Sequence, residues 1–103
     1  MNAVTEIKPD EIYTFMGDIP PAEYALRSKL RSYRNAANGM VSQTDSDTAR
    51  QLAWVVIEWA TPNLYAPASL EWLESLNKLS KRLMLTAMQV EEMELSIMGG
   101  FDD

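Results

Sequence analysis

The chain has 103 residues and a formal charge of −6, because fifteen acidic residues outnumber nine basic ones. This length predicts a single domain, residues 1–103, with one modest core, and the acidity disfavours binding to the phosphates of a nucleic acid. Cysteine and histidine are both absent, which excludes disulfides and thiol nucleophiles and removes the side chain most used for proton transfer and metal binding.

The apolar segments are short for a membrane protein. The longest of them, residues 52–57, falls far below the roughly twenty residues that span a bilayer. The amino terminus also lacks a basic segment followed by an apolar run, which a secretion signal would have. We therefore expect a cytoplasmic protein with no membrane contact.

The first twenty residues carry one predicted element. Residues 1–8 show no clear period, and we expect them to be loosely ordered. Pro9 and the two carboxylates after it are typical of a first helical turn, so a short helix with Ile12, Phe15 and Met16 on one side is predicted, ending at Gly17.

Residues 22–37 form the second predicted helix. Its apolar positions recur every three or four residues, as on one face of an α-helix; they are Leu26, Leu30, Tyr33 and Ala37. Asn38 and Gly39 follow as a left-handed stop signal. The helix is therefore expected to end there.

A basic stripe marks the other face of this helix. It consists of Arg27, Arg31 and Arg34, flanked by Lys29. A solvated face that balances the acidic remainder is the plain interpretation. A docking surface for an acidic partner is the functional one, whereas four positive charges on so acidic a chain are weak evidence for nucleic acid.

The third predicted helix follows a polar loop over 40–46. Asp45 or Ser46 is suited to cap its first turn, and the helix runs to about Ala60. Its middle is apolar nearly all round, which favours a central place in a bundle. We expect its core side chains to be Leu52, Val56 and Trp59. The β-branched run 55–57 also suits a strand, but the chain offers no convincing second strand to pair with it.

A segment with two prolines, residues 61–67, separates this helix from the next. Pro62 disfavours helix at Thr61, and Pro67 suits a first helical turn. Because the connection is short, the third and fourth helices should be antiparallel neighbours.

The fourth predicted helix is long, from Ala66 to Met98. One row of its apolar residues lies on a single stripe: Trp72, Leu76, Leu79, Leu83, Ala87, Val90, Met93 and Ile97. A second row beside it widens the face: Leu70, Leu73, Met84, Met88 and Leu95. So broad a face must be covered by the rest of the chain or by a partner. Gly99 and Gly100 should end the helix, leaving residues 99–103 as a short acidic tail.

The large apolar side chains allow two interpretations. Methionine fills irregular gaps in a core but is also frequent on surfaces that accept varied hydrophobic partners, and four of the seven methionines lie in the long helix. The three tryptophans could likewise anchor the core or act as binding hot spots. The residues that we propose from the sequence as a partner-binding set are Met84, Met88, Leu95, Trp72, Arg27, Arg31 and Arg34.

No catalytic or metal site is predicted. The densest carboxylates, Glu91, Glu92 and Glu94, are most simply a solvated face, and neither they nor Asp45 and Asp47 have the spacing of a magnesium or calcium loop. There is no glycine-rich phosphate loop, and a hydroxyl nucleophile would have only lysine or a carboxylate as its base. We expect a protein without cofactor or enzymatic activity.

The segment Ala49–Ser96 resembles the carboxy-terminal half of the tail assembly chaperones of long-tailed bacteriophages. In that family an apolar helix rich in Ala and Val precedes a short break, a hydrophobic-aromatic pair and a long helix with evenly spaced leucines. The residues that carry the likeness are 49–56, then Asn63, Leu64 and Tyr65, then Leu70, Leu73, Leu76, Leu79 and Leu83, and finally 94–96. The family often has an Asp-Gly turn before the aromatic, where this chain has Thr61-Pro62.

The spacing of the apolar residues predicts an all-α fold, a small helical bundle of three principal helices plus a short first one, with a long carboxy-terminal helix. The resemblance implies a non-enzymatic role in tail assembly. Such chaperones coat the tape measure protein in the host cytoplasm and keep it soluble until the tail tube protein polymerises around it. A Met- and Leu-rich groove could cover the apolar stripes of such a partner reversibly. Many weak contacts along one tape would sum to firm association.

Two other functions remain open at this point. One is a small acidic inhibitor or adaptor, of the phage antirepressor or anti-defence type, that blocks a single target. The other is a homo-oligomer, a helical structural subunit whose long helix is buried against copies of itself.

Overall fold

The computed structural model describes residues 21–101, and these contain three helices and no strand. They are α2 (Pro21–Gln43), α3 (Asp47–Asn63) and α4 (Leu70–Phe101). The predicted short helix over 9–16 and the loosely ordered segment 1–8 lie outside the described residues.

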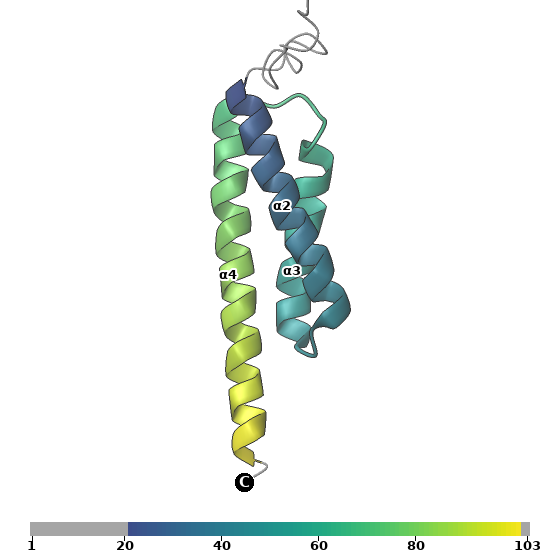
Figure 1. Cartoon of the computed structure of the whole chain (residues 1–103), viewed down its shortest axis with the longest axis vertical. Coiled ribbons are helices and arrows are strands. Elements are labelled where there is room, and N and C mark those ends of the chain that lie inside the picture. Colours follow the sequence, from purple (N-terminus) through teal and green to yellow (C-terminus); the bar gives the residue numbers. More distant parts are fainter. Residues whose placement is uncertain (1–20, 102–103) are drawn as a thin grey trace, which may run out of the picture.

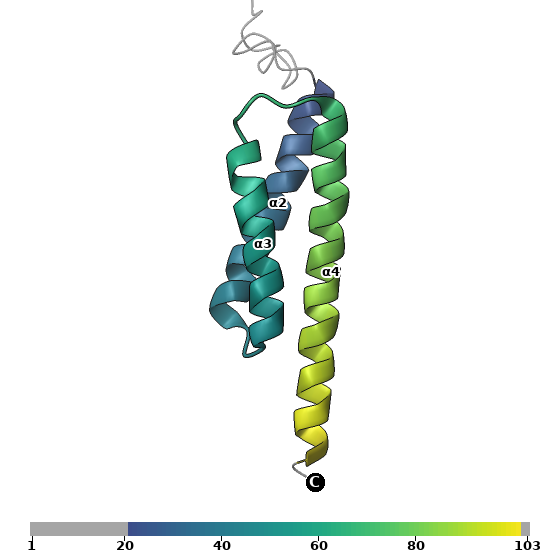
Figure 2. The same cartoon turned by 180° about the vertical axis from the view of Figure 1, so that it is seen from behind.

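Each helix contacts the other two, so the described part of the chain is a three-helix bundle. α3 runs antiparallel to both α2 and α4, as Figures 1 and 2 show from opposite sides. The predicted all-α class, the long carboxy-terminal helix and the antiparallel pairing of the third and fourth helices are confirmed. Figure 1 also shows the yellow end of α4 extending beyond the loop that joins α2 to α3.

α2 continues past the predicted stop at Asn38 and Gly39 and ends at Gln43. The expected core residues Leu30 and Ala37 are fully buried. Beyond the glycine, Met40 and Val41 pack against a core cluster that includes Ala37. This packing outweighs the roughly 1 kcal/mol that a glycine costs inside a helix, and the prediction of a helix end was wrong for that reason.

α3 begins as predicted and ends later than predicted. The Ser46 hydroxyl accepts a hydrogen bond from the Ala49 amide at 3.1 Å, which makes Ser46 the amino-terminal cap. The helix then passes through Pro62 to Asn63. Proline is tolerated because it lies in the exposed last turn, where it removes a single helical hydrogen bond.

Small side chains form the buried face of α3: Ala49, Ala53, Val56 and Ala60. Of the three predicted core residues only Val56 is fully buried, since Leu52 is half-buried and Trp59 is exposed. Although the middle of this helix is apolar nearly all round, the structure buries only one face of it. Three alanines let α3 approach its neighbours closely, and this approach leaves the bulky residues at the flanks of the contact.

α4 begins at Leu70 rather than Ala66, because Ser69 caps it. The Ser69 hydroxyl accepts from the Trp72 amide at 3.1 Å, and its carbonyl accepts from the Leu73 amide at 3.0 Å. Pro67 lies in the preceding loop. The predicted stop after Met98 was wrong as well, since the helix continues to Phe101.

The buried face of α4 lies between the two predicted apolar rows. Leu76 and Ala87 come from the first row, and Leu73 and Met84 come from the second. The polar residues Asn77 and Ser80 complete this face and are also buried. Because α2 and α3 both pack on α4, the helix turns the midline of its broad apolar face inward. Members of both rows that lie farther from the midline are left exposed, including Trp72 and Ile97 of the first row and Met88 and Leu95 of the second.

Candidate protein-binding surfaces

A hollow lined by two tryptophans lies where the end of α3 meets the start of α4. Its lining comes from both helices: Glu58, Trp59, Pro62, Asn63, Trp72 and Leu76. Trp59 is 46% exposed and Trp72 is 51% exposed, whereas Leu76 is buried. Tryptophan is among the side chains most enriched at binding hot spots. The hollow therefore offers two indole rings and a proline ring to a partner.

Asn63 holds this hollow together through three hydrogen bonds. Its Oδ1 accepts from the indole Nε1 of Trp72 at 3.0 Å, and its Nδ2 donates to the Trp59 carbonyl at 2.7 Å. Its backbone carbonyl accepts from Nη1 of Arg27 on α2 at 3.0 Å. One residue thus links all three helices. The Trp72 ring is held in place before any partner binds.

Arg27 is a structural residue rather than part of a free basic surface. It is only 9% exposed, its guanidinium pairs with Glu23 at 3.0 Å, and it donates to the Asn63 carbonyl. A buried arginine with its donors satisfied in this way has little left for a partner. Its place in the predicted docking surface is therefore corrected.

The other two arginines of that set are half-buried on α2. The Arg31 guanidinium lies 5.9 Å from the ring centre of Tyr65, a cation–π contact with the α3–α4 connection. Nε of Arg34 donates to Oδ1 of Asn35 at 3.3 Å. Each arginine of the predicted stripe therefore has a contact within the described chain. Binding by Arg31 and Arg34 stays a prediction.

Residues 85–97 of α4 carry the largest group of exposed apolar side chains among the described residues. They are Leu85, Met88, Met93, Leu95 and Ile97. Met88 and Leu95 belong to the predicted binding set and are accessible to a partner. Met84 is only 7% exposed and packs with Ala37, Ala53 and Val56, so its assignment to the binding surface is corrected.

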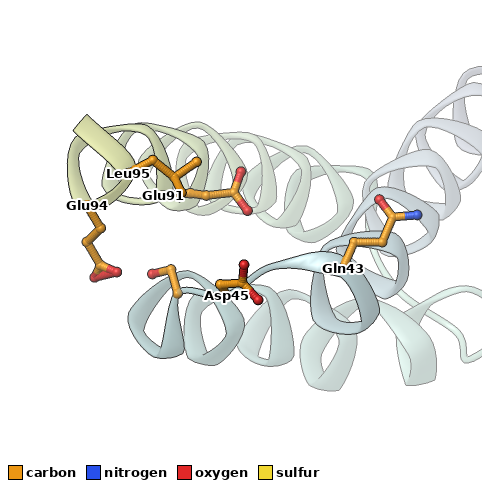
Figure 3. Close-up of a pocket in the computed structure, with 6 residues that line it drawn as sticks. Gln43, Asp45, Glu91, Glu94 and Leu95 are labelled. Carbon is orange, nitrogen blue, oxygen red and sulfur yellow. The ribbon is translucent and has the colours of Figure 1, made fainter. Parts of the chain in front are cut away.

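A second hollow, with an acidic lining, lies between α4 and the α2–α3 loop. It is lined by Gln43, Asp45, Ser46, Glu91, Glu94 and Leu95. Figure 3 shows Glu91 and Glu94 reaching from α4 toward the loop that carries Asp45. Within residues 21–101 no group of three acidic, histidine or cysteine side chains has the geometry to hold a metal ion. The carboxylates make this rim of the bundle negative.

Sequence reasoning missed Trp59, Pro62 and Asn63 as members of one site. It placed Trp59 in the core and treated 61–67 as a break in the chain. A signal was present in the spacing of Ala49, Ala53, Val56 and Ala60, because small residues at helical intervals indicate a close helix contact. Such a contact displaces the neighbouring tryptophan to the surface.

Along the described helices, no stretch is long and apolar enough to cross a membrane. No family model, no curated protein and no solved structure matches the chain.

Proposed function

We propose that this chain is a non-enzymatic chaperone that binds apolar helical segments of a partner protein and keeps that partner soluble. The observation that carries the proposal is the hollow at the α3–α4 junction, where Trp59 and Trp72 are held half-exposed. A solvent-exposed indole fixed by a hydrogen bond loses little conformational freedom on binding. It can therefore contribute its exposed apolar area to a complex.

The apolar surface extends from this hollow along α4. Leu79, Leu83 and Val90 follow Trp72 on the same side of the helix and are half-buried, and Ile97 beyond them is exposed. This side adjoins α3, because Trp72 bonds to Asn63 there. An elongated apolar surface of this kind, the proposed client surface, suits an amphipathic helix that presents apolar residues at helical intervals.

The charges indicate what kind of helix fits. Glu58 lies at the hollow, Glu91 and Glu94 line the far end of the bundle, and the whole chain carries −6. Opposite charges on two surfaces speed their encounter and disfavour wrong partners. The partner segment should therefore have lysine or arginine beside its apolar stripe.

A long helical protein with apolar stripes is the client that this surface suits, and the tape measure protein of a long-tailed phage is such a protein. The resemblance of Ala49–Ser96 to tail assembly chaperones supports the same role. Under this proposal the chain acts in the host cytoplasm and releases the tape measure protein as the tail tube protein assembles.

Co-expression with a candidate tape measure protein tests the proposal. The soluble fraction of the tape should rise with the native chain and fall back with Trp59→Ala. Trp54→Ala is the matched control, since Trp54 lies on the same helix and is also 46% exposed but does not line the hollow. No gain in tape solubility from the native chain, or equal loss with both variants, would overturn the proposal.

A further inference from the structure

A second exposed stripe runs along α4, well away from the tryptophan hollow. It consists of Lys81, Leu85, Met88, Glu92 and Leu95, at steps of four, three, four and three residues. All five side chains are exposed. Met88 is sixteen positions from Trp72, which places the two about 160° apart around the helix. The stripe is therefore distinct from the proposed client surface.

The charges of this stripe have no ion pair within the described chain. The ion pairs among residues 21–97 join Arg27 to Glu23 and Arg50 to Asp47, and neither involves α4. Lys81 and Glu92 are too far apart along the helix, eleven residues or about 16 Å, to reach each other. An acid and a base thus flank the exposed Leu85 and Met88 from opposite ends.

We propose that this stripe binds the same stripe of a second copy, with the two α4 helices antiparallel. A two-fold axis between positions 86 and 87 places Leu85 opposite Met88 of the second copy. The same axis places Lys81 opposite Glu92 of the second copy, and each contact occurs twice. An isologous interface requires this kind of self-complementarity.

A parallel arrangement in register lacks this match. It would bring Lys81 against Lys81 and Glu92 against Glu92, and like charges at a contact are destabilising. The stripe has a base at one end, an acid at the other and two apolar residues between them. This order favours a second copy as the partner and an antiparallel direction for its helix. The proposed client surface on the other side of α4 stays free in such a dimer.

Charge reversal in the full chain tests the pairing. Lys81→Glu and Glu92→Lys should each raise the Kd of self-association by about tenfold, since two symmetric attractions become repulsions. The double variant Lys81→Glu/Glu92→Lys should restore the native Kd. Lys29→Glu makes the same charge change as Lys81→Glu, but on α2, and should leave the Kd of self-association unchanged. Sedimentation equilibrium gives each Kd, and far-UV circular dichroism checks the fold.

Leu85→Asp should leave the chain monomeric at concentrations where the native chain is dimeric. A spin label attached at Ser75→Cys in the otherwise native chain reports whether the two α4 helices are antiparallel or parallel. The label attaches at this position alone, because the native chain has no cysteine. In the proposed antiparallel dimer, position 75 of one copy lies about 35 Å along the helices from position 75 of the other. In a parallel dimer the two would lie about 10 Å apart.

Three results would overturn the proposal: a native chain that stays monomeric at millimolar concentration, a dimer that the double variant does not restore, or a short label distance. None of these outcomes bears on client binding, since Trp59 and Trp72 lie outside the stripe. If the stripe binds a client in place of a second copy, the native chain will be a monomer and Leu85→Asp will lose client binding.

Discussion

The indole Nε1 of Trp72 donates a hydrogen bond of 3.0 Å to Oδ1 of Asn63, which joins the first turn of α4 to the last turn of α3. The same amide donates to the Trp59 carbonyl at 2.7 Å. One side chain therefore fixes the Trp72 indole and also bonds to the backbone of Trp59. Client binding through these rings should depend on that side chain.

Asn63→Ala should lower the free energy of unfolding by about 1 kcal/mol, because two partly exposed hydrogen bonds are lost. Client affinity should fall further than stability, since Trp72 loses the bond that holds its ring. Urea denaturation and client titration measure the two effects. Asn35→Ala, which removes an exposed amide on α2, is the control. An Asn63→Ala chain that binds its client as tightly as the native chain would show that the bond does not position Trp72.

Asn77 predicts a contrast between two substitutions. Its Nδ2 donates to the Leu26 carbonyl at 3.1 Å and to the Leu73 carbonyl at 2.8 Å, while its buried Oδ1 has no hydrogen-bond partner among the described residues. Asn77→Ala should destabilise the fold by about 2 kcal/mol, through two lost bonds and a cavity. Asn77→Leu should stay within about 1 kcal/mol of the native chain, because it fills the space and removes the unpaired oxygen.

Guanidinium denaturation separates these two variants of Asn77. If Asn77→Leu proves as destabilising as Asn77→Ala, the hydrogen bond to α2 contributes more to stability than the unpaired oxygen costs.

Gly39→Ala should raise the free energy of unfolding by about 1 kcal/mol. α2 continues through Gly39 to Gln43, and a Cβ at this position would meet nothing within 4 Å. Thermal or urea denaturation gives the change. A destabilised variant would indicate that the chain leaves the helix at Asn38, as the sequence alone predicts.

The carboxylates at the acidic hollow should repel one another. Glu94→Gln removes one negative charge from this hollow, where Asp45 and Glu91 remain. The free energy of unfolding should therefore rise by a few tenths of a kcal/mol, and the melting temperature should rise slightly. Added salt should shrink the difference. Glu71→Gln is a control that should respond in the opposite direction. It removes a carboxylate from the first turn of α4, where a negative charge interacts favourably with the helix dipole, so the free energy of unfolding should fall. An equal response in both variants would argue against repulsion at the hollow.

The sequence predicted the three described helices because apolar spacing is a local property. It predicted that the third and fourth are antiparallel because the connection between them is short. It failed at Gly39, Pro62 and Ala66, where a local stop or start signal was overridden. Packing of Met40 and Val41, tolerance of a proline in the last turn, and capping by Ser69 decided these ends. All three depend on the neighbouring helices or on a competing cap.

The candidate site was predicted only in part. Trp72, Met88 and Leu95 are exposed as a binding surface requires, but Met84 and Arg27 are not. Helical spacing tells which side chains share a face and leaves open which direction faces inward. In α4, packing against α2 and α3 together decides which face is buried. Asn77 lies on that face and is buried for this reason.

Calorimetric titration of the purified chain with an apolar helical peptide from a candidate tape measure protein tests the central claim most directly. A half-exposed indole at a hot spot contributes about 2 kcal/mol or more, so Trp72→Ala should weaken the affinity by at least about tenfold. Trp54→Ala should stay within about twofold of the native chain. Equal affinities for the native chain and both variants would contradict the claim that the α3–α4 hollow is the client site.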